Sequence, residues 1–437
     1  MKKCLVFTAF MVVVASLHGC NAFTSRTTGF ESDLARIEKG QPIHLDLVWQ
    51  YSLSAPVVAT PVASGNQLLV AAENGNLYSF DLLSQKLSWI YRAEGAIATT
   101  PAIANGVIYF LSRDGFLQAL DQLTGKRLWR FATGGEARFA AVGSYGMAPE
   151  AGAIPDPWDF QWSSPVVEKG KVYFGSSDKK LYALDAVSGT EVWSFTADNM
   201  IHSAPAIHNG KLFFGTWGSK VYALDANTGA ELWQFQAGVD AGFVMQGISA
   251  SPALDEQHVY VGARDGYVYA LRQTDGTSLW RYAAQSSWVL AEAALDTESV
   301  YVTTSDTGLL LALDKRNGKE KYRADTRFWT YTKPLLVDDR YVFVGNMSGE
   351  LYGFNKKTGA AAWYYQTPQA SADINDIIND ENGKLRTEKV FSPNVQLQAS
   401  VEWVKSLGAF VASPIWVNNQ LIAVTATGDV LLFKNNK

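Results

Sequence analysis

The sequence predicts an all-β protein, an eight-bladed β-propeller made of four-stranded antiparallel blades. Three observations predict this fold. A phrase recurs about every 40 residues, a small residue before proline marks each repeat, and the last repeat lacks its fourth strand. A period of this length is typical of propeller blades, in which each repeat is one small sheet.

The recurring phrase is clearest in "ALDANTGAELWQF" (223–235), which returns as "ALDQLTGKRLWRF" (119–131) and "ALDAVSGTEVWSF" (183–195). Each copy joins two strand-like runs through a glycine turn, and the second run holds a large aromatic residue. We expect these aromatic side chains to lie on the outer strands and to dock against neighbouring blades. They are Trp49, Trp89, Trp129, Trp193, Trp233, Trp280, Tyr322 and Trp363.

A second landmark confirms the count of eight. A small residue or lysine precedes proline at Thr60-Pro61, Thr100-Pro101, Ser164-Pro165, Ala204-Pro205, Ser251-Pro252, Lys333-Pro334 and Ser413-Pro414, with "AEAAL" (291–295) as a degenerate copy. Each repeat then reads as four short strands joined by Gly, Asn and Asp turns. One such sheet cannot bury both of its faces, whereas a ring of eight can.

The two ends of the chain complete each other. The last repeat, residues 413–436, contains three strands, and "LVWQYSL" (47–53) supplies a fourth. We expect the N-terminal strand to complete the C-terminal blade and close the ring, which removes the free sheet edges.

The N-terminus is a targeting segment. Lys2-Lys3 precede an apolar run that is too short to span a bilayer, and "LHGC", ending at Cys20, resembles a bacterial lipobox. We therefore expect a lipoprotein signal peptide over residues 1–19, lipidation of Cys20, a tether over residues 20–45 and a propeller over residues 46–437. Asn21 favours the outer membrane by resemblance to enterobacterial lipoproteins. The alternative is an ordinary cleaved signal with a chance cysteine.

Composition excludes several classes of function. The net charge is −5 and no long Lys/Arg run occurs, which argues against nucleic acid as a partner. The two cysteines, Cys4 and Cys20, leave the body of the chain without a disulfide. The five histidines show no metal-ligand spacing, so no metal site is predicted.

The phrase A-L-D-x-x-T-G-x-x-x-W resembles the quinoprotein-type propeller repeat, named for dehydrogenases that use pyrroloquinoline quinone (PQQ), and the resemblance covers residues 47–436. Eight blades with a lipobox are similar to the propeller lipoproteins of the outer-membrane β-barrel assembly machinery (BamB-like proteins). That resemblance implies a non-catalytic scaffold without a cofactor, docked on periplasmic domains of the barrel subunit. The quinoprotein alcohol dehydrogenases place PQQ beside a disulfide of adjacent cysteines, which this chain lacks, so the sequence argues against PQQ with calcium.

A binding site is expected where the segments before each small-residue–proline step converge on one mouth of the ring. The candidate mouth residues are Trp162, His202, Gln246, Trp288, Glu292, Trp329, Tyr331, Lys333 and Phe410. Aromatic faces with a few polar groups suit a small molecule, a sugar or a peptide segment. The alternative is a set of aromatic plugs that fill a narrowing channel. No catalytic residues are assigned.

Two insertions interrupt the repeat, near residues 136–160 and 369–408. The first is a candidate lid or partner loop, with Arg138, Phe139, Tyr145 and Trp158 exposed in principle, or else unstructured decoration. The second contains "ASADINDIINDENGKL", which predicts a short acidic helix with a solvated face, because the spacing of its acids does not fit a calcium loop.

The sequence thus favours an outer-membrane-anchored periplasmic lipoprotein that acts as a non-catalytic scaffold for a protein partner, with outer-membrane β-barrel assembly as the specific hypothesis. The alternative is a periplasmic small-molecule-binding or PQQ-dependent oxidoreductase propeller that uses the channel mouth.

Overall fold

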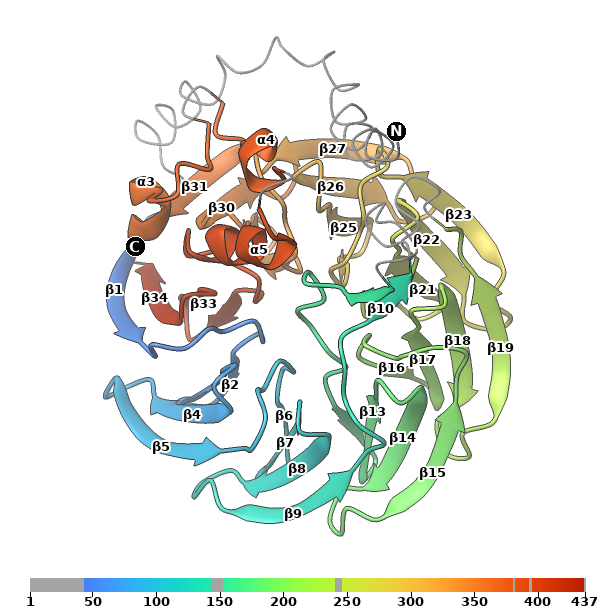
Figure 1. Ribbon diagram of the computed structural model, residues 1–437. Helices are drawn as coiled ribbons and strands as arrows, with labels where there is room; N and C mark the ends of the chain where they lie inside the picture. The colour runs from blue at the N-terminus through green and yellow to red at the C-terminus, as the bar shows by residue number, and fades with distance from the viewer. Residues whose placement is uncertain (1–42, 143–151, 240–245, 380–381, 393–394, 436–437) are drawn as a thin grey trace, which may run out of the picture.

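Eight four-stranded antiparallel sheets surround a central axis in the computed structural model, which confirms the predicted propeller (Figure 1). The structure describes residues 43–142, 152–239, 246–379, 382–392 and 395–435. Among these residues, no helix is long and apolar enough to cross a membrane.

The strands of each blade follow one another from the axis outward. Blades 1 and 2 are β2 (Val62–Ser64), β3 (Gln67–Ala71), β4 (Asn76–Asp81), β5 (Lys86–Arg92), β6 (Ala102–Ala104), β7 (Val107–Ser112), β8 (Phe116–Asp121) and β9 (Arg127–Ala132). Blades 3 and 4 are β12 (Val166–Glu168), β13 (Lys171–Gly175), β14 (Lys180–Asp185), β15 (Glu191–Thr196), β16 (Ala206–His208), β17 (Lys211–Gly215), β18 (Lys220–Asp225) and β19 (Glu231–Gln236).

Blades 5 and 6 are β20 (Ala253–Leu254), β21 (His258–Gly262), β22 (Tyr267–Arg272), β23 (Ser278–Ala283), β24 (Ala294–Leu295), β25 (Ser299–Thr303), β26 (Leu309–Asp314) and β27 (Glu320–Asp325). Blades 7 and 8 are β28 (Leu335–Val337), β29 (Tyr341–Gly345), β30 (Glu350–Asn355), β31 (Ala361–Gln366), β32 (Ile415–Val417), β33 (Gln420–Val424) and β34 (Asp429–Asn435), completed by β1 (Leu45–Ser52). The second and third strands of each blade are covered on both faces, which explains their near-continuous apolar runs.

Ring closure follows the prediction. β1 pairs antiparallel with β34, from Leu45 opposite Asn435 to Ser52 opposite Asp429. Trp363 of blade 7 donates its indole N–H to the carbonyl of Leu45 at 3.2 Å. The N-terminal strand therefore supplies both the missing strand and a contact between neighbouring blades.

The recurring Trp and the recurring Gly are partners across blades. Trp193 lies against Gly229 in the turn of the next blade, where an added Cβ would lie 2.7 Å from the indole ring. The same indole donates to the carbonyl of Ala226 at 3.3 Å. Only glycine fits a turn with positive φ and an aromatic ring pressed against it. The phrase therefore repeats because the aromatic ring of each blade packs on the glycine turn of the next blade.

The same arrangement recurs around the ring. Trp89, Trp129, Trp233, Trp280 and Tyr322 lie against Gly125, Gly189, Gly276, Gly318 and Gly359 of the following blades. Trp49 of β1 packs instead against Phe80 of blade 1, with ring centroids 5.6 Å apart. Blade 1 has Gln85, at φ +57°, where the other turns have glycine.

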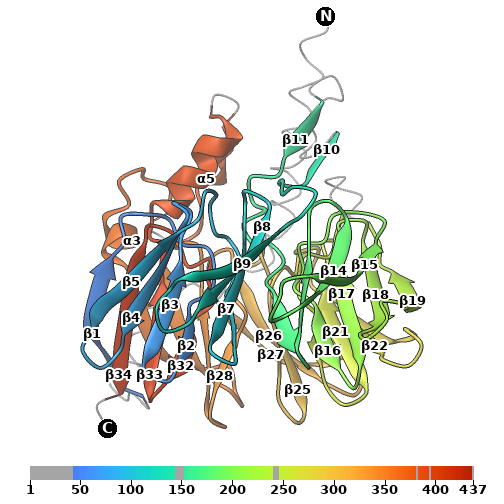
Figure 2. The same cartoon turned by 90° about the horizontal axis from the view of Figure 1, so that it is seen from below.

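Both insertions rise from one end of the disk, as Figure 2 shows. The first forms a hairpin of β10 (Ala140–Val142) and β11 (Ala153–Pro155). The second carries α3 (Pro368–Ala372), α4 (Thr387–Val390) and α5 (Leu397–Lys405). Both lie between the last strand of one blade and the first strand of the next, which fixes the face they share; we call it the insertion face.

The predicted acidic helix is wrong, because α3 ends where the acids begin. Asp373 has φ +31° and its carboxylate accepts the backbone N–H groups of Ile377 and Ile378 at 3.1 and 2.8 Å. Aspartate often competes in this way with helical hydrogen bonds. Asp376 pairs with Arg386 and Lys389 at 3.2 and 3.1 Å, so this acid is neutralised within the insertion.

Candidate functional site

A cavity of about 670 Å³ lies on the propeller axis, and five of the nine predicted mouth residues line it. These five are Trp162, His202, Glu292, Tyr331 and Lys333. The volume falls within the range of small-molecule sites. Gln161, at the end of the first insertion, also lines the cavity and donates to the carbonyl of Val411 at 3.2 Å.

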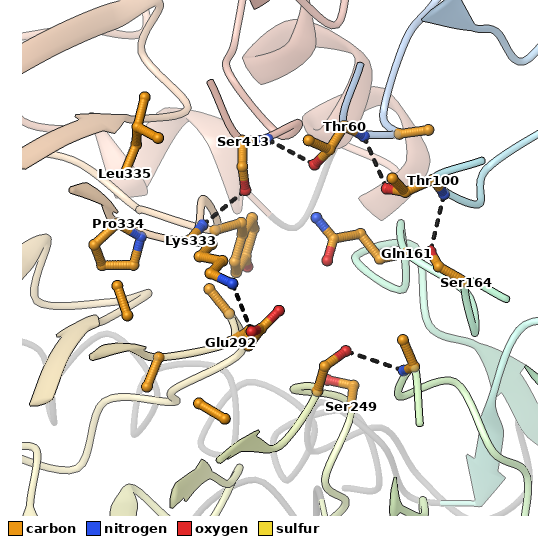
Figure 3. Close-up of a pocket in the computed structure, with 18 of the residues that line it drawn as sticks. Thr60, Thr100, Gln161, Ser164, Ser249, Glu292, Lys333, Pro334, Leu335 and Ser413 are labelled. Carbon is orange, nitrogen blue, oxygen red and sulfur yellow. Dashed lines mark hydrogen bonds and ion pairs between the residues drawn. The ribbon is translucent and has the colours of Figure 1, made fainter. Parts of the chain in front are cut away.

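The small residues before proline form a belt of hydrogen bonds around this cavity (Figure 3). The backbone N–H of Thr60 donates to the hydroxyl of Thr100 in the next blade, and that of Thr100 donates to Ser164, at 3.2 and 2.9 Å. Ser413 donates in turn to Thr60 at 3.2 Å, across the point of ring closure. Each hydroxyl therefore ties two blades together, which explains why small hydroxyl residues recur at this step.

Two belt positions carry charges instead. Glu292 and Lys333 occupy the step of blades 6 and 7, and Lys333 Nζ lies 2.5 Å from Glu292 Oε1. Their side chains are 34% and 43% exposed, so water screens the pair and it stabilises the fold by no more than about 1 kcal/mol. The ion pair between these two side chains therefore contributes little to the stability of the fold.

The remaining four mouth residues lie away from the cavity lining. Trp329 packs edge-on against Trp158 at 5.0 Å between ring centroids, and Phe410 is fully buried between blades 7 and 8. Trp288 lies beneath the guanidinium of Arg264 at 4.6 Å. Gln246 is half-buried and does not reach the cavity. Trp329 and Phe410 therefore fit the alternative prediction, that aromatic side chains serve packing, better than the prediction of a ligand site.

The first insertion closes the insertion-face end of the channel through a buried plug, residues 156–160. Asp156 Oδ2 lies 3.0 Å from Arg264 Nη2, with side chains 2% and 1% exposed. The guanidinium of Arg264 is stacked between Trp217 and Trp288 at 4.4 and 4.6 Å from the ring centroids. Breaking such a buried pair costs about 3–5 kcal/mol, so this contact fixes the plug in the channel.

A second buried network ties the base of the insertion to blades 3 and 4. Glu136 accepts hydrogen bonds from the hydroxyls of Ser176 and Ser177 at 2.6 and 2.9 Å. Ser177 Oγ lies 2.9 Å from His202 Nε2, and His202 Nδ1 lies 3.0 Å from Asp159 Oδ2. Burial raises the pKa of Glu136, although the serine hydrogen bonds oppose that change.

Ser177, His202 and Asp159 resemble the order of a hydrolytic triad, but their surroundings give them a structural role. The Ser177 hydroxyl lies 2.9 Å from the Glu136 carboxylate and 2.9 Å from the Ala137 carbonyl, so two acceptors of the first insertion compete with His202 for its proton. The three side chains are also buried. A nucleophile needs its proton directed at the histidine base, whereas here the insertion offers that proton two other acceptors, and Trp217 donates its indole N–H to His202 Nδ1 at 2.9 Å.

The expected exposed partner loop is largely buried at its described positions. Phe139 is stacked on Trp217 with ring centroids 4.2 Å apart and planes 2° apart, and Trp158 is buried under the second insertion. Arg138 is half-buried, and Tyr145 lies outside the described residues. The expectation of exposure fails for Phe139 and Trp158 because aromatic residues fill the channel end.

Sequence reasoning missed Glu136, Asp156 and Arg264. One sequence signal could have revealed these contacts. The residue two positions after the glycine that ends the second strand differs from blade to blade. This position holds Ser177, Trp217 and Arg264 in blades 3, 4 and 5, and all three contact the first insertion or its partners. Variation inside an otherwise constant repeat marks the residues that make specific contacts.

Comparison with known proteins identifies the family of the chain. The family model described as "Outer membrane protein assembly factor BamB", of the PQQ-type propeller repeat, matches residues 45–153, 146–287 and 264–433. The chain belongs to the BamB family. A curated relative, outer membrane protein assembly factor BamB of Kangiella koreensis, is 27% identical over 147 residues, which is 29% of this chain and 33% of that protein. The match thus spans about a third of the relative's length.

Solved structures share the fold. BamB from Moraxella catarrhalis has a TM-score of 0.65 at 18% identity, covering 90% of this chain and 100% of that one. The quinohemoprotein alcohol dehydrogenase from Comamonas testosteroni has a TM-score of 0.63 at 16% identity, covering 89% and 76%. At these identities the likeness concerns the fold alone.

The chain lacks one feature of the quinoprotein alcohol dehydrogenases, the disulfide of adjacent cysteines beside PQQ. No cysteine follows Cys20, so the adjacent-cysteine disulfide cannot form. Within the described residues, no three His, Cys, Asp or Glu side chains gather as metal ligands. Trp158 and Phe160 of the plug are buried at the channel end.

Proposed function

We propose that this BamB-family protein is a non-catalytic scaffold of outer-membrane β-barrel assembly, held by a lipid on Cys20 at the periplasmic face of the outer membrane. The family match along nearly the whole propeller carries this proposal. The partner is a periplasmic or outer-membrane protein, with the barrel-assembly subunit as the specific candidate.

Rigidity of the insertion face supports a scaffold. The Asp156–Arg264 pair and the stacked Phe139 and Trp217 hold the first insertion on the ring. Lys405 of α5 reaches Glu73 of blade 1 at 3.1 Å, which holds the second insertion. A pre-organised surface binds a partner without a further cost of ordering loops.

Two exposed apolar side chains on the insertions support a partner contact on this face. Val142 on β10 is 53% exposed, and Ile374 after α3 is 83% exposed. Both lie on insertions rather than on the repeated blades, so neither is needed to build the ring. We propose that the partner contacts each insertion at these residues.

The test is copurification from detergent-solubilised membranes with the tagged, lipidated protein. Wild type should retain barrel-assembly subunits, and the combined Val142→Asp and Ile374→Asp variant should lose them. Leu232→Asp, on the outer strand β19 and 47% exposed, is the matched control and should behave as wild type. Absence of any barrel-assembly subunit in the wild-type sample would contradict the proposal.

The axial cavity favours a second candidate, a periplasmic protein that binds a small polar molecule or a quinone. Glu292 and Lys333 supply one acid and one base in a lining that is otherwise largely apolar. An absorbance spectrum of the purified protein, alone and with PQQ and calcium added, tests the quinone version. A bound chromophore whose retention is lost in Glu292→Gln or Lys333→Gln would favour this candidate over the scaffold.

A further inference from the structure

The face opposite the insertions can be assigned from topology. Strands within a blade run antiparallel, so the turn between the third and fourth strands lies at the end away from the insertions. β1 is the fourth strand of blade 8 and starts at Leu45 beside Asn435, the end of the third strand. The first described strand therefore begins, at Leu45, on this second face, which we call the turn face.

Three consecutive blades expose an aliphatic side chain at the same position of this turn. Leu83, Leu123 and Val187 are 77%, 84% and 86% exposed. Leu47 and Val48, at the start of β1, are 40% and 42% exposed and continue the row onto blade 8, the neighbour of blade 1. We call these five residues the aliphatic arc.

The other blades carry polar residues at the matching turn position: Asn227, Thr274, Arg316 and Lys357.

The turn does not require an aliphatic residue. The Asp121 carboxylate caps the turn of blade 2 by accepting the N–H of Thr124 at 2.8 Å. Asp225 caps the turn of blade 4 in the same way at 2.9 Å, although Asn227 replaces the leucine there. Single exposed leucines are ordinary, but repetition at one position in adjacent blades, without a folding reason, indicates a contact surface.

Charged side chains of both signs occur on the turn face. Lys86 and Lys126 are exposed beside the arc. On the opposite blades, Glu256, Glu298 and Asp339 have side chains that are 86%, 81% and 100% exposed. The opposite blades also expose Arg316 and Lys357, and their three acids lie beside His208, Lys321 and Lys356, so charge alone does not orient this face.

We infer that the aliphatic arc rests on the surface of the lipid bilayer, so that the disk is tilted with blades 8 and 1 to 3 toward the membrane. The inference rests on the anchoring in the proposed function, because the expected lipid on Cys20 is followed 25 positions later by Leu45 on this same face. Aliphatic tips flanked by lysines are the side chains that interfacial contacts use. The insertion face then points away from the bilayer, toward the partner.

Cysteine labelling tests the inference directly, since Cys4 lies in the expected signal peptide and Cys20 carries the expected lipid. Lipidated Leu123→Cys and Asn227→Cys would each be labelled with an environment-sensitive fluorophore. Both proteins would be reconstituted on vesicles of phosphatidylethanolamine and phosphatidylglycerol. The label at position 123 should shift to shorter wavelength and be quenched by brominated lipid, while the label at position 227, in the same turn of blade 4, should stay as in water.

Equal, water-like emission from both labels would overturn the inference. Shielding at position 123 that needs barrel-assembly protein and does not occur on vesicles alone would also overturn it, and would assign the arc to a protein partner. A triple variant, Leu83→Ser with Leu123→Ser and Val187→Ser, should keep the thermal midpoint of the wild type and retain the copurified subunits. In this variant, a water-soluble quencher should gain access to a fluorescent label on Lys86→Cys. This outcome separates the membrane contact from the scaffold function.

Discussion

Replacing Gly229 with alanine should destabilise the propeller more than the same change at Gly210. Both glycines belong to blade 4 and have φ values of +74° and +75°. At both positions, alanine would have to adopt a left-handed backbone conformation, which costs an L-residue roughly 1–2 kcal/mol. At Gly229 that Cβ would lie 2.7 Å from Trp193 of the preceding blade, whereas nothing lies within 4 Å at Gly210.

The magnitude follows from this difference. Overpacking a close contact adds about 1–3 kcal/mol, so Gly229→Ala should cost about 2–5 kcal/mol and Gly210→Ala about 1–2 kcal/mol. An unfolding entropy of about 2.1 cal/mol/K per residue over about 390 residues makes 1 kcal/mol equal to about 1.2 °C. Tm should therefore fall by about 2–6 °C at Gly229 and by about 1–2 °C at Gly210.

The assay is thermal unfolding followed by circular dichroism and by tryptophan fluorescence, because two probes reveal departures from two-state behaviour in a chain of this size. A double variant with Trp193→Ala should remove the extra loss at Gly229, since the two residues share one contact. Equal falls at Gly229 and Gly210 would refute the docking of each blade's tryptophan on the next blade's turn.

Three further predictions concern the insertion and the cavity. Asp156→Asn should remove one buried carboxylate beside Arg264 and cost about 3–5 kcal/mol. The loss should appear as faster proteolysis of the first insertion, and an unchanged digestion rate would contradict the plug. Burial raises the pKa of Glu136 above its ordinary 4.5, so the folded chain binds a proton that the unfolded chain releases. Protonation of Glu136 therefore stabilises the fold fully below pH 4.5, and this contribution to the free energy of unfolding is lost as pH rises through the raised pKa. Glu136→Gln should therefore flatten the dependence of Tm on pH in that window, and an unchanged slope would count against the buried network. Glu292→Gln should alter the free energy of unfolding by no more than about 1 kcal/mol and leave copurification intact, whereas loss of the copurified partner would assign the cavity a role in binding.

The sequence predicted the ring because the residues that build it are local and repeated. Trp193 and Gly229 occupy equivalent positions in successive copies of one phrase, so spacing alone reveals both. The hydroxyls at the small-residue–proline step recur for the same reason, although their role as a hydrogen-bonded belt emerged only from the structure.

The channel plug escaped prediction because its contacts join segments without a common pattern. Asp156 and Arg264 come from an insertion and from blade 5, and neither residue forms part of a motif. The mouth prediction treated every aromatic residue before the proline step as facing the axis. Trp329 and Phe410 instead pack beneath the second insertion and between blades, where apolar surface was available to cover them.

Site-specific photo-crosslinking in intact cells tests the central claim most directly. A photoreactive residue would replace Val142 on the insertion face, with Asn227 on the turn face as the matched position. The scaffold account predicts a crosslink from position 142 to the barrel-assembly subunit and none to that subunit from position 227. A crosslink to it from position 227 but not from position 142, or no crosslink to any barrel-assembly protein from position 142, would contradict the account.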